Sequence, residues 1–242
     1  MNKNTVLFEN KGGVKMIAHR GVSGLEVENT LPAFVAAGVK SYYGIETDVH
    51  VTKDGQFIVV HDDDLNRIAN LDMSVENSDF AQLRAVKLKD TDKVTERGDL
   101  FLPSLQEYIS VCRKYDKQAI LELKNQMKEQ EVWEIAKIIQ EMGWFERTTF
   151  ISFAADNLLY LRQKRPTANA QFLVCDATDE ELQFMIDHRL DADICDYGVT
   201  KEKVDKLHKA GLKVNVWTVD AIENANRLKD CGVDMITSNI LE

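Results

Sequence analysis

Seven side chains of types that bind metal ions or anions, or transfer protons, stand at the ends of four short apolar runs. They are His19, Arg20, Glu46, Asp48, His61, Glu122 and Lys124. Each run has the composition of a buried strand, and the carboxyl ends of parallel strands meet at one mouth of a barrel, where catalytic groups collect. Four unrelated structural accidents would hardly produce this pattern, so we expect the seven groups to form one site.

The three carboxylates among them suit a metal site. Glu46 and Asp48 are two residues apart on an expected strand, so their side chains leave the same face, about 7 Å apart at the backbone. With Glu122 nearby, the three charges would repel one another unless a cation compensated them. Oxygen ligands favour a hard ion, so the sequence predicts one divalent cation, Mg²⁺ or Ca²⁺, without deciding between the two.

The basic side chains suit a phosphate group. Arg20 offers a planar fork and Lys124 a point charge for phosphate oxygens. His19 and His61 titrate near neutrality and could act as acid and base on opposite sides of a phosphorus atom, in an order that the sequence does not decide. Two structural alternatives remain: each histidine could be a hydrogen-bonded structural residue, and Lys124 with Glu122 could be a buried ion pair.

Short β-rich runs alternate with amphipathic stretches along the whole chain, which predicts a parallel sheet covered by helices. The expected strands are Lys15–Ala18, Gly44–Val49, Phe57–Val60, Gln118–Leu123, Thr148–Phe153, Ala170–Val174, Ala192–Asp196, Lys213–Val219 and Asp234–Thr237. The expected helices lie near Leu31–Ser41, Ser104–Lys114, Lys128–Met142, Ala155–Lys164, Asp179–Arg189, Lys201–Ala210 and Ala221–Cys231. About eight strand and helix units favour an α/β protein of the (β/α)8 TIM barrel type. A doubly wound open sheet is the alternative, although no glycine-rich phosphate loop follows any strand.

Two irregularities interrupt this alternation. Only Val51–Gln56 separates the second strand from the third, and it contains the hairpin-type turn Asp54-Gly55, so the strands are either antiparallel or joined by a tight extended link. The segment Asp62–Leu102 is about forty mostly polar residues, longer than an ordinary loop. We interpret it as a small cap over one barrel mouth. The expected organisation is a single domain, residues 1–242, with a cap insertion after the third strand at about 62–102.

Composition excludes several classes of protein. The 242 residues are 44% hydrophobic, enough for one large domain. The formal net charge of −10 disfavours nucleic acid as a partner. No apolar run is long enough for a transmembrane segment and the chain starts without a secretion signal, which favours a cytoplasmic location. The four cysteines lie far apart and are expected to be reduced thiols, and no apolar seam indicates an oligomeric state.

Motifs in a fixed order run through nearly the whole chain. They are Ala18-His19-Arg20-Gly21, Glu28-Asn29-Thr30-Leu31, Ala33-Phe34, Gly44-Ile45-Glu46-Thr47-Asp48-Val49, Thr52-Lys53-Asp54-Gly55, His61-Asp62, Leu65-Asn66-Arg67, Pro103-Ser104-Leu105, Glu122-Leu123-Lys124, Ser152-Phe153 and Val216-Trp217-Thr218-Val219. In order and spacing the set resembles the glycerophosphodiester phosphodiesterase family, metal-dependent barrels related to the phosphatidylinositol-specific phospholipases. His-Arg-Gly alone would be a weak signal, but the ordered set is specific.

The resemblance implies an activity and a role for each matching position. The implied roles are cation ligands Glu46, Asp48 and Glu122, acid–base pair His19 and His61, phosphate-binding Arg20 and Lys124, and a substrate-pocket wall formed by Trp217 and Phe153. Glu28 and Asn29 are expected to brace the loop after the first strand, with a role of Glu28 as a cation ligand as the alternative. The implied partner is a small-molecule phosphodiester, cleaved to sn-glycerol 3-phosphate and an alcohol by water or through a cyclic phosphate.

The sequence departs from the family pattern at three places. His50 stands where the family more often has Gln, and we expect a contact at the rim of the site, not a metal ligand. Ser238-Asn239 replaces the usual residues at barrel closure, which we expect to affect local packing only. The segment Asp72–Phe101 matches poorly, so the alcohol part of the substrate stays open. The acidic run Asp62–Asp64 is expected to be a solvated turn.

Other functions remain as alternatives. A related phosphodiesterase acting on lysophospholipids or on another phosphodiester would use the same site. A glycosidase would pair carboxylates without a metal and leaves both histidines and Arg20 unexplained. A Schiff-base aldolase would need a neutral Lys124, which neighbouring carboxylates disfavour. A barrel that binds a metal without activity is the non-enzymatic alternative.

Overall fold

Eight parallel strands form a closed barrel in the computed structural model, which describes residues 4–92, 94–95 and 97–242. Closure comes from the first strand, which pairs with both the second and the last. In order around the barrel the strands are β1 (Lys15–Ala18), β2 (Gly44–Val51), β6 (Gln118–Leu123), β7 (Thr148–Ser152), β8 (Asn169–Val174), β9 (Asp191–Cys195), β10 (Val214–Trp217) and β11 (Met235–Ser238). The predicted (β/α)8 barrel is confirmed, and the open doubly wound sheet is excluded.

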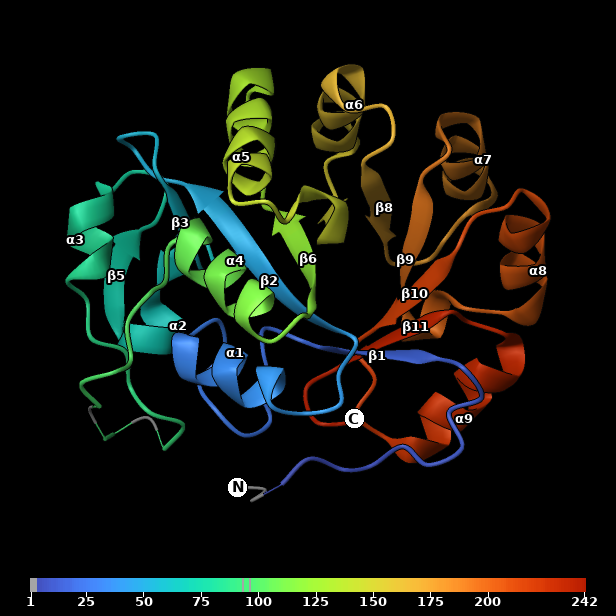
Figure 1. Ribbon diagram of the computed structural model, residues 1–242, viewed down its shortest axis with the longest axis horizontal. Coiled ribbons are helices and arrows are strands. Elements are labelled where there is room, and N and C mark those ends of the chain that lie inside the picture. The colour runs from blue at the N-terminus through green and yellow to red at the C-terminus, as the bar shows by residue number, and fades with distance from the viewer. Residues whose placement is uncertain (1–3, 93, 96) are drawn as a thin grey trace.

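Helices lie outside the barrel between successive strands (Figure 1). They are α1 (Leu31–Gly38), α4 (Leu105–Lys114), α5 (Glu129–Glu141), α6 (Ala155–Lys164), α7 (Asp179–His188), α8 (Lys201–Lys209) and α9 (Ile222–Cys231), with the 3-10 turns η1 (Phe145–Arg147) and η2 (Asp196–Gly198). Local sequence signals define several helix ends. Thr178 and Glu181 form a capping box at the start of α7, and Gly232, whose φ is 91°, ends α9.

Inside the barrel, an apolar layer separates the two mouths. It consists of Ile17, Ile120, Ile151, Leu173 and Met235, with Trp217 packed against it. Large aliphatic side chains of this kind fill the interior of TIM barrels in layers. The carboxyl-terminal ends of the strands therefore form a mouth of their own, and that mouth carries the charged residues picked out from the sequence.

The third expected strand does not belong to the closed barrel. β3 (Phe57–Val59) pairs with β2 in antiparallel fashion, with Val49 opposite Val59 and Val51 opposite Phe57. The connecting turn contains Gly55 at a φ of 74°, as a tight hairpin requires. Because β3 runs back along the end of β2, its last residues return to the carboxyl-terminal mouth. This reversal carries His61 to the site.

The segment after β3 forms a small lobe beside the barrel, next to β3 and α1 in Figure 1. It contains β4 (Asp64–Leu65), α2 (Asn66–Ala69), β5 (Leu71–Ser74) and α3 (Phe80–Arg84). The lobe packs through its own apolar cluster, whose buried members are Val27, Ile58, Val60, Leu65, Ile68, Val75, Leu83, Leu88, Leu100 and Leu102. Since Ile58 and Val60 come from β3 and its end, the same short strand supports both the lobe and His61.

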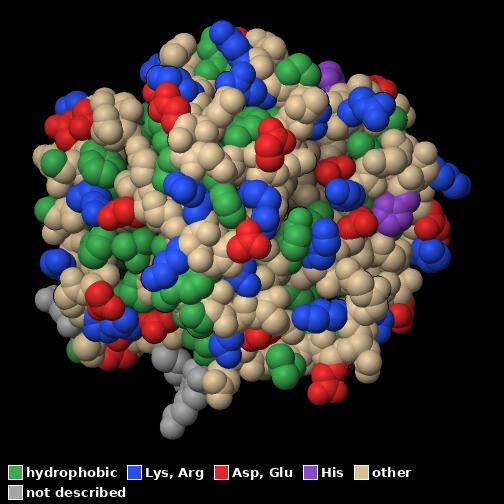
Figure 2. All heavy atoms as spheres, viewed as in Figure 1, with side chains coloured by type: hydrophobic (Ala, Val, Ile, Leu, Met, Phe, Trp, Pro, Cys, Tyr) green, Lys and Arg blue, Asp and Glu red, His purple; other side chains and the backbone are tan. Residues whose placement is uncertain are grey.

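The surface mixes charges of both signs. On the face shown in Figure 2, Lys and Arg side chains alternate with Asp and Glu, and no broad area of one sign stands out. None of the helices in the described residues is long and apolar enough to cross a membrane.

Candidate active site

A small cavity of about 50 Å³ opens at the carboxyl-terminal mouth of the barrel; we call it the carboxyl-terminal cavity. Its lining comprises His19, Arg20, Glu46, His61, Glu122, Ile151, Phe153, Leu173, Asp193, Trp217 and Thr237. Seven of the nine residues expected from the sequence are in this set. The other two lie beside it, because Lys124 Nζ is 2.9 Å from Glu122 Oε1 and 3.9 Å from Asp48 Oδ1.

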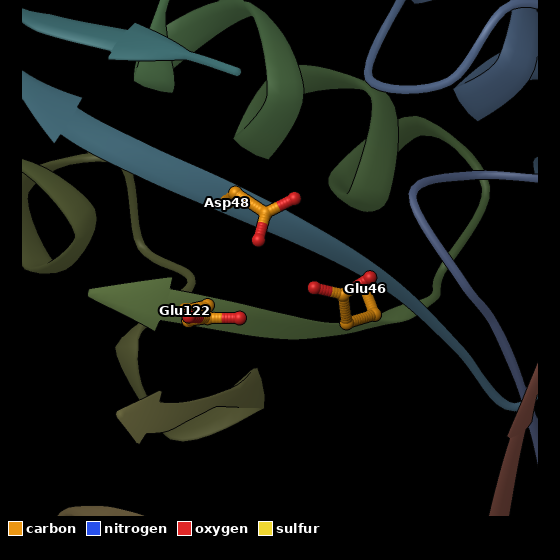
Figure 3. Close-up of side chains that lie close together, drawn as sticks. All are labelled: Glu46, Asp48 and Glu122. Carbon is orange, nitrogen blue, oxygen red and sulfur yellow. The ribbon is translucent and has the colours of Figure 1, made fainter. Parts of the chain in front are cut away.

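The three carboxylates converge from two adjacent strands. Glu46 and Asp48 leave the same face of β2, and Asp48 stands directly opposite Glu122 on β6 (Figure 3). One oxygen from each carboxylate lies within 4.8 Å of the others, and all three residues are buried. Burial and the neighbouring Asp48 charge raise the pKa of Glu46 and bring that of Glu122 to about 8. Burial opposes ionisation of Asp48 too, but Arg20 and Lys124 lower its pKa.

These carboxylates fit a hard divalent cation. Asp48 Oδ1 is buried and accepts no hydrogen bond from the described residues. A buried carboxylate oxygen without a hydrogen bond destabilises the folded state. A cation bound at a metal–oxygen distance of about 2.0–2.6 Å would compensate its charge. A cation would also relieve the repulsion that raises the pKa values of Glu46 and Glu122.

Arg20 is held at the site by an unusual backbone turn. Arg20 and Gly21 have φ values of 52° and 76°, and a Cβ on Gly21 would lie 2.7 Å from Ala33, so only glycine fits there. The Arg20 amide donates to Glu46 Oε2 at 2.8 Å, and its guanidinium donates to Glu28 Oε1 at 2.9 Å. Arg20 Nε is buried without a hydrogen-bond partner among the described residues. It lies 3.6 Å from Asp48 Oδ2, so the two groups form an ion pair, and the Nε–H keeps its capacity to donate to an anion.

Glu28 and Asn29 lie where the sequence analysis expected a brace. Asn29 Nδ2 donates to Asp48 Oδ2 at 2.7 Å, and Asn29 Oδ1 accepts from Thr47 Oγ1 at 2.7 Å. Glu28 pairs with Arg20 and with Arg67 of the lobe. Glu28 is outside the group of carboxylates that could share a cation.

His19 is fixed by a chain of polar side chains that the sequence did not reveal. Its Nδ1 lies 2.7 Å from Asn239 Oδ1. Asn239 Nδ2 donates to Asp220 Oδ2 at 2.6 Å, so Asn239 Oδ1 must be the acceptor and His19 Nδ1 carries the proton. His19 Nε2 then faces Glu46, whose Oε2 is 4.0 Å away. Burial, followed by the Arg20 charge, lowers the pKa of His19 to about 4.

The expectation that Ser238-Asn239 concerns local packing alone is wrong, because Asn239 holds a histidine of the site. Ser23 Oγ also donates to Asn239 Oδ1, at 2.6 Å. Asn239, one of the residues that depart from the family pattern at barrel closure, is therefore in direct contact with the site.

His61 is oriented in the same way by its neighbour. His61 Nδ1 lies 2.7 Å from Asp62 Oδ1, and Asp62 Oδ2 accepts from Arg67 Nε at 2.7 Å. Burial lowers the pKa of His61 despite the nearby Asp48 charge. Burial opposes ionisation of Asp62, but its hydrogen bonds from Arg67 and His61 bring its pKa to about 2. The prediction of a solvated acidic turn is wrong for Asp62, a charged partner of the histidine.

His50 is buried away from the cavity, not exposed at its rim. Its Nδ1 lies 3.1 Å from Glu76 Oε1, and its Nε2 lies 3.3 Å from the carbonyl oxygen of His61. Asn125 Nδ2 also donates to Glu76 Oε1, at 2.9 Å. His50 therefore ties β2 to the lobe and is outside the group that could hold a metal.

The open side of the cavity is aromatic. The rings of Phe153 and Trp217 meet edge to face with centroids 5.7 Å apart. Phe153 is 48% exposed, while Trp217 is largely covered and directs its Nε1 toward the carbonyl oxygen of Asp193 at 3.4 Å. Asp193 itself was not among the residues expected from the sequence.

A parallel (β/α)8 barrel with three carboxylates, two oriented histidines and two cationic side chains at its carboxyl-terminal mouth defines a barrel phosphodiesterase. The profile of the glycerophosphoryl diester phosphodiesterase family matches residues 19–242. The chain belongs to this family.

The chain is also similar to curated relatives, and it shares its fold with a solved structure. A glycerophosphodiester phosphodiesterase of Bacillus altitudinis is 29% identical over 229 residues, 92% of this chain and 93% of that protein. The human lysophospholipase D GDPD1 is 36% identical over 69 residues, 28% of this chain and 22% of that protein. An Oleispira antarctica phosphodiesterase, solved with the product sn-glycerol-3-phosphate, superposes with a TM-score of 0.85 at 23% identity, over 97% of this chain and 96% of that one, and so shares the fold.

Proposed function

We propose that this protein hydrolyses glycerophosphodiesters to sn-glycerol 3-phosphate and a free alcohol, with one divalent cation held by Glu46, Asp48 and Glu122. The observation that carries the proposal is the unsatisfied charge at one mouth of the barrel. There, a buried carboxylate oxygen of Asp48 and a buried Nε–H of Arg20 both lack hydrogen-bond partners among the described residues. A cation and an anionic phosphate would satisfy the two atoms together.

When bound, the cation would polarise the phosphate and neutralise the negative charge that develops on it. The chain's own residues bind and orient the diester. Arg20 donates to a phosphate oxygen through the free face of its guanidinium, and Lys124 adds a positive charge from the other side of Asp48. Both cations are fixed by the carboxylates before substrate arrives, so little reorganisation is needed when the phosphate binds.

His19 and His61 move the protons. Each has its Nδ1 against an oxygen acceptor, Asn239 Oδ1 or Asp62 Oδ1, which leaves Nε2 to face the reacting groups. One neutral histidine accepts the proton of the nucleophile at its Nε2, and the other, protonated on both ring nitrogens, donates its Nε2 proton to the leaving alcohol oxygen. The nucleophile is water or a neighbouring hydroxyl of the substrate.

The test is an assay of glycerol 3-phosphate release by chelator-stripped protein. Glycerophosphocholine and glycerophosphoethanolamine serve as substrates, with Mg²⁺, Ca²⁺ or no metal added back. We expect release to return with at least one ion and to stay absent without metal. The variant Asp48→Asn, assayed at the same ion concentrations, should remain inactive. No release with either ion, by folded protein that binds the ion, would contradict the proposal.

A lysophospholipid substrate is the second candidate, supported by the match to the human lysophospholipase D over part of the chain. The same metal site would serve it. Adding lysophosphatidylcholine to the panel separates the candidates, because cleavage of this lipid at a higher kcat/KM than either glycerophosphodiester would favour the second.

A further inference from the structure

Asp193 is a buried carboxyl group at the floor of the carboxyl-terminal cavity, and the proposed chemistry does not use it. It lies on β9, is 1% exposed, and lines the same cavity as His19 and Glu46. Burial raises its pKa to about 7. A lone acidic side chain in the interior of a barrel is costly, so its presence needs a physical reason.

A polar chain across three strands holds Asp193 in place. Asn215 Nδ2 donates to Asp193 Oδ1 at 2.8 Å and to Thr237 Oγ1 at 2.9 Å. Thr237 Oγ1 in turn donates to Asn215 Oδ1 at 3.3 Å. No side chain of the described part of the chain donates to Asp193 Oδ2. Thus one oxygen of the carboxyl group is anchored and the other remains available to a group that enters the cavity.

The rest of the floor is apolar and the space is small. Ile151, Leu173 and Trp217 line the cavity together with Asp193, and the cavity is about 50 Å³. A three-carbon arm with hydroxyl groups matches this mixture of apolar side chains and one buried carboxyl group. A trimethylammonium group is bulkier and would lie toward Phe153, the exposed side of the cavity.

We propose that Asp193 binds a hydroxyl group of the substrate's glyceryl arm and so selects diesters with an unacylated glycerol. This inference rests on the proposed function, since it assumes that the phosphate lies between His19, His61 and Arg20. Asp193 is a binding residue in this scheme, because no bond is made or broken at it. The alcohol that leaves would occupy the open side of the mouth, where the chain sets few limits on its size.

The experiment compares two phosphate monoesters that differ only in hydroxyl groups. Binding of sn-glycerol 3-phosphate and of propyl phosphate is measured by calorimetry for wild type, Asp193→Ala and Asp193→Asn, with the divalent ion that supports activity. Asp191→Asn is the matched control, because Asp191 lies on the same strand but faces the amino-terminal mouth. Release of glycerol 3-phosphate from glycerophosphocholine is followed in parallel to give KM and kcat.

In wild type and in Asp191→Asn, we expect sn-glycerol 3-phosphate to bind about tenfold more tightly than propyl phosphate, as one hydrogen bond allows. In Asp193→Ala the ratio should fall to about one, with KM for glycerophosphocholine raised and kcat nearly unchanged. Asp193→Asn, which keeps the shape and a hydrogen-bonding group, should retain most of the ratio. If Asp193→Ala fails to fold, the wild-type ratio decides, and equal affinities for the two monoesters overturn the inference.

The outcomes also separate this inference from the function on which it rests. A wild-type protein that releases no glycerol 3-phosphate from either diester overturns both. A wild-type protein that does, with an affinity ratio that Asp193→Ala leaves unchanged, overturns only the role of Asp193.

Discussion

The two mouths of the barrel differ in size and in the state of their charged groups. The amino-terminal cavity is the larger, at about 450 Å³, and is lined by polar residues that include Gln171, Asp191 and Asp234. Two of its carboxylates have partners: Asp191 accepts from the Lys213 amide at 2.8 Å, and Asp234 accepts from His208 Nε2 at 3.0 Å. The carboxyl-terminal cavity is about 50 Å³, yet beside it lie two charged side chains, Asp48 and Arg20, each with a buried atom that has no hydrogen-bond partner among the described residues.

What distinguishes the mouth with the proposed site is buried charged groups with incomplete hydrogen bonding, and not the volume of its cavity. At the amino-terminal mouth the buried atom without a partner among the described residues is a neutral amide oxygen, Gln171 Oε1. At the other mouth, Asp48 Oδ1 and Arg20 Nε are the buried atoms in that condition, and both carry formal charge. Groups with perturbed pKa values and incomplete partners mark sites at which a ligand completes the electrostatics.

The largest effect should come from neutralising the carboxylate with the free oxygen. We expect Asp48→Asn to reduce turnover by about 10⁴-fold, because the loss of the cation removes several kcal/mol of transition-state stabilisation. Calorimetric titration with Mg²⁺ and Ca²⁺ should show binding to wild type and none to the variant. Asp191→Asn, at the amino-terminal mouth, should keep both metal binding and activity. If Asp48→Asn still binds the ion and turns over at the wild-type rate, the free oxygen of Asp48 does not hold a metal ion, and the proposed difference between the two mouths fails.

The next largest effect should come from the histidines. His19→Ala and His61→Ala should each reduce kcat by about 10²- to 10⁴-fold with an unchanged circular dichroism spectrum, since each loses one proton transfer. His208→Ala is the matched control, because His208 pairs with Asp234 beside the other mouth. Near-native rates in both site variants would show that the histidines are structural.

The contrast between the mouths was partly visible in the sequence. The strands and helices followed from periodicity, and the charged residues at strand ends were recognisable because buried parallel strands are otherwise apolar. His61 was expected at the end of the third strand, whose direction the sequence left open, and the structure shows that this strand is antiparallel to β2. That reversal depends on a pairing between strands, which periodicity does not report.

The residues that orient the histidines could not be predicted, for a different reason. Asn239 contacts His19 across 220 positions of sequence, and only closure of the barrel brings the two together. The contact of Asp62 with His61 could not be predicted either, because Asp62 belongs to an acidic run and such runs are usually exposed to solvent. Asp193 lies within an expected strand, where a single polar residue is indistinguishable by pattern from one that faces solvent.

A smaller effect should follow from removing the group that orients His19. Asn239→Ala should reduce kcat by roughly 10- to 100-fold, because the His19 ring loses the hydrogen bond that fixes its orientation. Nitrogen-15 chemical shifts of His19 should then show a mixture of tautomers in place of a proton held on Nδ1. Asn169→Ala, on the wall of the amino-terminal cavity, should leave both kcat and the tautomer unchanged. An unchanged tautomer in Asn239→Ala would mean that the contact does not position the ring.

The smallest effect concerns pH and would show which histidine is acid and which is base. The Asp62 carboxylate raises the pKa of His61 against the larger effect of burial, so Asp62→Asn should lower that pKa further. If His61 acts in its protonated form, the alkaline limb of the kcat/KM profile moves to lower pH. If it acts as a neutral base, the acidic limb moves to lower pH instead.

In either case one limb should move to lower pH while the limb governed by the other histidine stays in place. Asp64→Asn is the control within the same acidic run, because Asp64 accepts from the Asn66 amide and, in the described part of the chain, makes no hydrogen bond or ion pair with either histidine of the site. A limb that moved to higher pH would contradict the sign of the Asp62 interaction. Two unmoved limbs would place the titration that governs the rate on a group other than His61, and the acid–base pair would then have to be sought elsewhere in the carboxyl-terminal mouth.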